Sequence, residues 1–296
     1  MVRSILKRIS LFLLLTFSLT HAKTADLVTF SYNRPMQLYA FLESVDLYVT
    51  NLKETHVIYR ASDDTYEKGY QIVKETFPDI VFYRQGKNPK KDFKPLTLKA
   101  SFKSPSKYII FAVDDIIITD FIDINEGIKY LKNIDAYGFF YRLGKNITFN
   151  YPRNAKDKVP ELFELSDDIY QWCFKSARQG YWRYPNTVDL TLYAKKDIRK
   201  DLKSLPFTSP NTLEGRWHTR SGKVIARNAL CYQHSKMINI PVNLVQSTFR
   251  NRNTAEYTPK ELLEIFNNGM KIDIAAFFKI NNKSSHMDYP LPFIER

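Results

Sequence analysis

The sequence predicts a mixed α/β fold in which helices flank a mostly parallel sheet, with a small helical extension at the C-terminal end. Two observations predict it. Short apolar segments of strand length alternate with amphipathic segments of helix length through the first half of the chain. Polar residues follow several of these strand segments where each one ends. The carboxyl ends of parallel strands share one sheet edge, so these polar residues are expected to converge there.

The first strand and helix are read from residues 26–48. Residues 26–31 (DLVTFS) form a short apolar run that ends in polar residues, and Pro35 suits the first turn of a following helix. One face of that helix is apolar at three- and four-residue spacing, through Leu38, Phe41, Leu42 and Val45. These positions predict a strand followed by a helix packed on the sheet.

The next elements repeat this pattern. Residues 56–60 are expected to form the second strand, and Asp64 is expected to cap a helix in a box-like pair with Glu67. Further expected elements are a strand at 80–83, a helix at 96–102, a strand at 108–113, a helix at 124–133 and a strand at 136–142. The strand at 108–113 is the most apolar of them and ends in two aspartates.

The second half is less regular. Residues 150–168 are charged and contain two prolines, which indicates a long loop or lid, and residues 204–223 form a Pro/Ser/Asn-rich segment. Strands are expected at 190–193 and 238–245. Thr258 and Glu261 form a capping box for a helix that ends near Gly269. We therefore expect one domain over residues 24–250 and a helical C-terminal extension over residues 251–296.

Composition and charge exclude several classes of protein. Hydrophobic residues make up 44% of the 296 residues and charged residues 25%, which is typical of a globular chain. The nine glycines form no GxGxxG, GxxxxGK[ST] or GxSxG motif, and CxxC and HExxH are also absent. The net charge of +13 attracts anions such as phosphate-bearing molecules. No nucleic-acid-binding motif accompanies it, so nucleic acid is not an expected partner.

The N-terminus resembles a targeting segment. Basic residues at 3, 7 and 8 precede an apolar run over residues 9–19, and Ala22 follows at a cleavage-like position. We expect residues 1–22 to be a secretory signal peptide, which places the protein in the secretory pathway, whether periplasmic, extracytoplasmic or lumenal. The alternatives are an uncleaved anchor, which would associate the protein with a membrane, and a buried helix. Cys173 and Cys231 could form one disulfide or stay as two thiols.

Asp114 and Asp115 are the first candidates for chemistry. Carboxylates at the end of a buried strand need partners, and carboxylate oxygens suit Mg²⁺ or Mn²⁺, which often also bind a substrate phosphate. Together with the basic surface, this favours a divalent metal beside a diphosphate. The alternative is a strand-end pair that caps the next turn.

Two segments resemble family 2 glycosyltransferases of the GT-A fold. Residues 29–35 (TFSYNRP) are similar to the first-strand nucleotide-binding segment of that family, and residues 113–115 (VDD) resemble its short acidic metal motif. The aspartates are adjacent here, whereas the common form is DxD. The resemblance implies a GT-A-like (Rossmann-like) domain, a nucleotide-sugar donor and a divalent metal, Mn²⁺ or Mg²⁺, bound to the donor diphosphate.

The resemblance also implies roles for single residues. Ser31, Arg34, Asp63 and Asp114 would border the nucleotide-sugar, and His234 could join Asp114 and Asp115 as a metal ligand. A general base from the second half would deprotonate the acceptor, and Asp189 and Glu214 are the candidates. Each candidate has a plain structural alternative: a helix residue for Glu214, a turn residue for Asp189 and an ordinary histidine for His234.

The sequence therefore predicts a metal-assisted glycosyltransferase that moves a sugar from a nucleotide diphosphate-sugar to an acceptor hydroxyl. The acceptor is a glycan, lipid or protein that the sequence does not identify. The alternative is a catalytically inactive descendant that binds carbohydrate or another surface, and a third possibility is an extracellular anion-binding protein.

Overall fold

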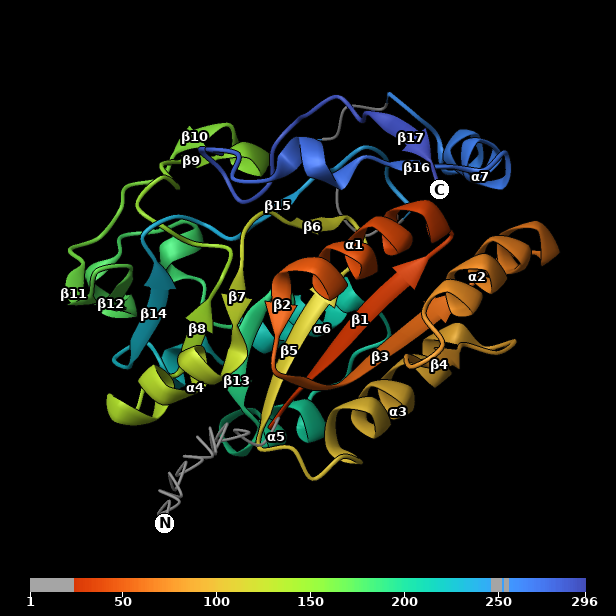
Figure 1. Cartoon of the computed structure of the whole chain (residues 1–296). Helices are drawn as coiled ribbons and strands as arrows, with labels where there is room; N and C mark the ends of the chain where they lie inside the picture. The colour runs from red at the N-terminus through yellow and green to blue at the C-terminus, as the bar shows by residue number, and fades with distance from the viewer. Residues whose placement is uncertain (1–23, 246–251, 253–255) are drawn as a thin grey trace, which may run out of the picture.

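A nine-stranded sheet forms the centre of the molecule in the computed structural model, which describes residues 24–245, 252 and 256–296 (Figure 1). In sheet order its strands are β11 (Phe163–Ser166), β12 (Ile169–Cys173), β14 (Asn228–Tyr232), β8 (Gly138–Phe140), β13 (Thr191–Ala194), β5 (Tyr108–Val113), β1 (Ala25–Tyr32), β3 (Leu52–Arg60) and β4 (Val81–Arg84).

The two halves of the sheet differ in strand direction. β4, β3, β1 and β5 all run parallel. β13 is antiparallel to both β5 and β8, β14 is parallel to β8, and β12 and β11 continue antiparallel. β1 is buried along nearly its whole length, as expected for a central parallel strand that is covered on both faces.

Helices cover both faces of the sheet, so the predicted α/β fold class is confirmed. The helices are α1 (Pro35–Tyr48), α2 (Asp64–Thr76), α3 (Pro89–Phe102), α4 (Ile124–Asn133), α5 (Lys195–Ser204), α6 (Pro210–His218) and α7 (Pro259–Asn267). Apolar residues of α1, α2, α4 and α7 share one core, whereas those of α3, α5 and α6 share a second core on the opposite face. β1 contributes side chains to both cores, Leu27 to the first and Val28 and Phe30 to the second.

Short elements complete the fold. The paired strands are β2 (Val49–Thr50) with β7 (Ile122–Asp123), β6 (Ile116–Ile118) with β15 (Met237–Asn239), β9 (Phe149–Asn150) with β10 (Ala155–Lys156), and β16 (Met270–Ile272) with β17 (Phe293–Glu295). Single 3₁₀ turns are η1 (Tyr151–Arg153), η2 (Phe174–Ser176), η3 (Tyr181–Arg183), η4 (Ser221–Lys223) and η5 (Ile274–Phe277).

Several element boundaries differ from the sequence predictions. Asp63, not Asp64, caps α2, because its carboxylate accepts the amides of Thr65 and Tyr66. The segment 204–223 contains α6, whose cap is Ser209 in a capping box with Thr212. Residues 150–168 contain η1, β10 and β11 rather than a continuous loop, and the late strand is confined to β15.

The C-terminal part contains strands as well as a helix. The capping box that was predicted for α7 is confirmed: the Thr258 hydroxyl accepts the Glu261 amide, and the Glu261 carboxylate accepts the Thr258 amide. α7 packs against α1 and α2, and β16 and β17 pair beside it (Figure 1). The expected boundary at residues 250 and 251 lies outside the described residues.

Two predictions from the sequence bear on the cellular compartment, one about the N-terminal segment and one about the two cysteines. The N-terminal segment, residues 1–22, lies outside the described residues. Within the residues that the structure does describe, no helix combines the length and apolar character that a membrane span requires. Cys173 and Cys231 are free thiols, which decides the alternative that the sequence left open.

Candidate functional site

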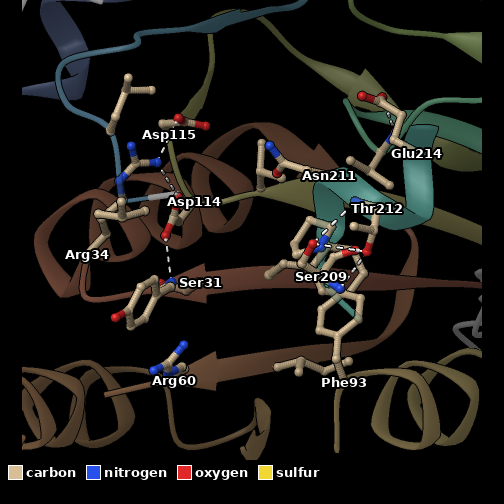
Figure 2. A pocket seen from close by; sticks show the side chains of 18 of the residues that line it. Ser31, Arg34, Arg60, Phe93, Asp114, Asp115, Ser209, Asn211, Thr212 and Glu214 are labelled. Carbon is tan, nitrogen blue, oxygen red and sulfur yellow. Dashed lines mark hydrogen bonds and ion pairs between the residues drawn. The ribbon is translucent and has the colours of Figure 1, made fainter. Parts of the chain in front are cut away.

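A cavity of about 710 Å³ opens at the carboxyl ends of β1, β3 and β5 (Figure 2). Ser31 and Tyr32 end β1, Arg60 ends β3, and Asp114 follows β5. The predicted convergence of polar residues at this edge is confirmed for Ser31 and Arg34 at the end of β1 and for Asp114 and Asp115 after β5, whereas the predicted cluster at residues 62–64 after β3 does not line the cavity. The volume lies within the range of about 300–1,000 Å³ that is usual for small-molecule sites.

The two aspartates after β5 hold the guanidinium of Arg34. Nη1 of Arg34 donates to Oδ1 of Asp114 at 3.1 Å and to Oδ2 of Asp115 at 2.8 Å. Its Nε donates to Oδ1 of Asn243 at 2.9 Å, and its Nη2 donates to the Asn243 carbonyl oxygen. Burial alone would lower the pKa of Arg34, but the two carboxylates outweigh burial and raise that pKa above its ordinary value.

The remaining carboxylate oxygens also have partners. Oδ2 of Asp114 accepts the backbone amide of Tyr32 at 3.3 Å, and Oδ1 of Asp115 accepts Nδ2 of Asn239 at 2.9 Å. Burial raises the pKa of Asp114 to about 6, an effect to which Asp115 adds and which Arg34 opposes. The cluster is therefore a closed ion-pair network.

Asp189 also lines the cavity, two residues before β13 begins. Burial raises its pKa from 3.8 to about 6, and Arg142 is the main opposing charge. Leu190, the next residue, has a positive φ of 40°, an unfavourable conformation for a branched side chain. The sharp turn places the Asp189 side chain in the cavity wall while Leu190 stays in the core.

Glu214 lies on α6, in the same wall (Figure 2). Its Oε1 accepts the hydroxyl of Thr187 at 2.6 Å and the amide of Val188 at 3.0 Å. Burial, followed by the nearby Asp189, raises the pKa of Glu214. Glu214 therefore fixes the segment that leads into Asp189, and the structure brings both base candidates together.

His286 is a site residue that sequence reasoning missed. It comes from the C-terminal part, and its Nε2 lies 3.6 Å from Oδ2 of Asp189. Its Nδ1 lies 3.1 Å from the hydroxyl of Tyr181, and the two rings stack. Burial lowers the pKa of His286 to about 4, so the ring is neutral at pH 7. No sequence motif surrounds this histidine that could have identified it.

Arg142 was missed as well. It is fully buried and donates to the carbonyl oxygens of Tyr181 and Tyr184 at 3.3 and 3.1 Å. Its positive charge lowers the pKa of Asp189, Glu214 and His286 alike and so partly offsets the effect of burial on the two carboxylates. Arg142 is the last residue of the strand that was predicted over residues 136–142, but nothing in the sequence distinguished it from the chain's many other basic residues.

Two predicted ligands lie elsewhere. Asp63 is exposed and caps α2, and it does not line the cavity. His234 is exposed after β14, where the chain leaves the sheet, and it does not line the cavity either. Ser31 does line the cavity and shares a 2.7 Å hydrogen bond with the Tyr70 hydroxyl. Among the described residues, no group of three or more His, Cys, Asp or Glu residues could hold a metal ion.

The opposite part of the cavity is apolar and basic. Phe30, Ile58 and Phe93 line it beside Arg60, whose guanidinium lies 4.4 Å from the centre of the Tyr32 ring. Lys90, at the start of α3, also lines the cavity. Arg252 lines it from a different side, where its guanidinium contacts Asn154 and the Tyr151 ring. The cavity thus has a basic and apolar section beside an acidic section. Phe30, Ile58, Phe93, Arg60 and Lys90 line the first, and Asp189 and Glu214 line the second.

The raised pKa of Asp189 predicts a stability change. The folded value of about 6 lies above the ordinary 3.8, so ionisation of Asp189 opposes folding as pH rises through this interval. Asp189→Asn removes that opposition. We expect the free energy of unfolding to rise by about 2 kcal/mol at pH 8 and by less than about 1 kcal/mol at pH 4. Urea unfolding at both pH values measures the difference, and an equal change at both would contradict the assignment.

Comparison with known proteins relates the chain to a glycosyltransferase. No family model matches it. Over 189 residues it is 25% identical to the bifunctional glycosyltransferase pgtA of Dictyostelium discoideum, a match that covers 58% of this chain and 24% of that protein. The chain therefore spans about a quarter of the length of this curated relative.

Two solved structures are also similar. S. aureus TarS 1-349 in complex with UDP has a TM-score of 0.46 at 12% identity, over 70% of this chain and 57% of that one. The mannosyltransferase PcManGT from Pyrobaculum calidifontis, in complex with GDP-Man and Mn²⁺, has a TM-score of 0.40 at 12% identity, over 71% and 55% of the chains. The sequence match shows that part of this chain is similar to a glycosyltransferase.

Proposed function

We propose that this protein transfers a sugar from a nucleotide diphosphate-sugar to an acceptor hydroxyl. The observation that carries the proposal is the cavity at the carboxyl edge of the parallel strands, where a basic and apolar section adjoins a buried carboxylate of raised pKa. The sequence similarity to a glycosyltransferase supports the same reaction.

The basic and apolar section fits the donor. Phe30, Ile58 and Phe93 offer the apolar contact that a nucleobase needs. Arg60 and Lys90 line the same section, and neither forms an ion pair with a carboxylate in the described part of the chain. A diphosphate would supply the partner that both cations lack.

The acidic section fits the acceptor. We assign Asp189 as the general base, because Oε1 of Glu214 is already bonded to Thr187 and Val188. In the reaction, the Asp189 carboxylate takes the proton of the acceptor hydroxyl. The acceptor oxygen then bonds to the anomeric carbon, and the bond from that carbon to the diphosphate breaks. Glu214 acts as a positioning residue for the segment before Asp189.

The predicted metal fits this site poorly. A divalent cation would offset charge on the departing diphosphate. Arg34 already occupies the space between Asp114 and Asp115, however, and it supplies a positive charge there. The proposed reaction therefore includes no step that depends on a metal ion.

Donor binding tests the proposal. In calorimetric titrations with UDP- and GDP-sugars, we expect one of these donors to bind and Arg60→Met to weaken its binding about tenfold, through loss of a charge-assisted contact. Arg199→Met is the matched control. Arg199 also lies 4.4 Å from an aromatic ring centre, that of Phe102, but outside the cavity.

The outcomes separate the alternatives. Donor binding that is weakened by Arg60→Met and unchanged by Arg199→Met supports the transferase. Absence of binding across the panel, in folded protein, contradicts it. Glycan binding without donor binding would favour the carbohydrate-binding alternative. The N-terminal segment supports a secretory or membrane-anchored location as part of the same proposal.

A further inference from the structure

We propose that Asp114 and Asp115 hold Arg34 as a permanent counter-ion and do not form a divalent-metal site. Arg34 and the two aspartates line the cavity of the proposed function, but their pairing does not depend on which ligand that cavity binds. The inference rests on the N–H donors that the carboxylates already accept, on the way Arg34 is fixed and on the residues that surround the pair.

The first step is the set of donors that the two carboxylates already accept. Each of their four oxygens accepts an N–H group: Arg34 supplies two of these contacts, and the Tyr32 amide and Asn239 supply the others. A divalent cation needs oxygen lone pairs aimed at it. Each oxygen keeps a second lone-pair site, but a cation that approached it would also face the positive hydrogens of these donors.

The second step is the fixation of Arg34, which two further anchors hold in place. Its Nε and Nη2 are bonded to Asn243, and its backbone amide donates to the Tyr70 hydroxyl at 3.2 Å. Arg34 is 7% exposed. To admit a metal, the guanidinium would have to leave both carboxylates while it stayed buried, and an unpaired buried charge is strongly unfavourable.

The third step is the environment of the pair. The guanidinium leaves one net negative charge on the two aspartates, which weakens attraction for a dication. No third acidic, histidine or cysteine ligand joins the pair in a possible metal-binding group among the described residues. Figure 2 shows the Arg34 guanidinium turned toward the two aspartates and Glu214 on the far side of the cavity.

The consequence is a division of charge within the cavity. Arg34 neutralises the acidic pair inside the protein, whereas Arg60 and Lys90 line the section that faces a ligand. An anionic ligand would therefore meet arginine and lysine directly, without a bridging metal. Its binding is expected to be insensitive to chelators.

Manganese binding to the full chain tests the assignment. The free Mn²⁺ signal in electron paramagnetic resonance reports binding without any reaction. We expect wild type and Asp115→Asn to bind Mn²⁺ equally weakly, within about twofold of each other. We expect Arg34→Met, which releases the carboxylates, to bind at least about tenfold more tightly. Arg34→Met/Asp115→Asn should lose that gain.

Arg60→Met is the matched control, since it removes a cavity arginine that has no contact with the aspartates; its Mn²⁺ binding should equal that of wild type. Wild-type binding that is tight and falls at least tenfold in Asp115→Asn would overturn the assignment. That comparison is decisive even if Arg34→Met fails to fold, because it uses only wild type and a variant that keeps Arg34 and Asp114.

The nucleotide-sugar titration separates this inference from the proposed function. A donor that binds equally well, within twofold, in EDTA and in Mn²⁺ supports both. A donor that binds only with Mn²⁺, and that loses binding in Asp115→Asn, supports the transferase and overturns the counter-ion assignment. If no donor binds, the proposed function fails, and the Mn²⁺ measurement still decides the role of the aspartates.

Discussion

Asp189→Asn should lower the turnover of sugar transfer by about 10²–10⁴-fold and leave donor affinity within about twofold. The amide cannot take the acceptor proton, and this range is typical for loss of a general base. Donor affinity is preserved because Asp189 lies in the acidic section, away from the basic residues that are expected to contact the donor. Release of nucleoside diphosphate from the donor that binds measures the change.

Glu214→Gln is the control for this prediction. The glutamine carbonyl oxygen can still accept the Thr187 hydroxyl and the Val188 amide, so we expect a loss of less than about tenfold. Because Asp189→Asn is also expected to stabilise the fold above pH 6, lost activity in a more stable protein cannot be attributed to misfolding. A larger loss for Glu214→Gln than for Asp189→Asn would reverse the two assigned roles.

The second large effect is on stability, at the opposite edge of the sheet. Lys195→Met should lower the free energy of unfolding by about 3–5 kcal/mol, because it leaves a buried carboxylate without its cation. Nζ of Lys195 donates to Oδ2 of Asp26 at 2.7 Å, and Asp26 is 0% exposed. Among the described residues, the hydroxyls of Ser104 and Ser106 would then be the remaining hydrogen-bond donors to that carboxylate. Chemical denaturation at pH 7 measures the loss.

Lys223→Met is the matched control. Lys223 also pairs with an aspartate, Asp201 at 2.9 Å, but its side chain is 52% exposed, so we expect a change of less than about 1 kcal/mol. Asp26→Leu/Lys195→Met removes both buried charges and should recover most of the stability that Lys195→Met loses. Equal effects of the buried and exposed lysine substitutions would contradict the role of burial.

Local patterns predicted much of the fold. Apolar segments that alternate with amphipathic ones identified β1, β3, β5 and the helices between them. Parallel strands that are buried on both faces have continuous apolar sequences, which makes them easy to recognise. The same pattern brought Ser31, Arg34 and Asp114 to one edge, since that rule depends only on strand direction. Asp189 and Glu214 were found as acidic residues in the second half, and both line the cavity.

The rest depended on contacts that no local pattern records. Arg34 lines the cavity, and the contacts of its guanidinium with Asp114, Asp115 and Asn243, which is far along the chain, could not be read from a local pattern. His286 enters the cavity only because the C-terminal part folds back over the sheet edge, beside Asn239. The α2 cap was misassigned by one residue, since Asp63 and Asp64 are chemically identical candidates.

The cavity walls come from segments between Phe30 and His286, and this has a consequence for folding. No shorter stretch of the described chain contains all the walls. We therefore expect the complete site to form only after its most distant segments have met. A ligand of this cavity would bind the fully folded state alone and would stabilise the whole described fold by mass action. Slowed global unfolding would then report binding even without chemistry.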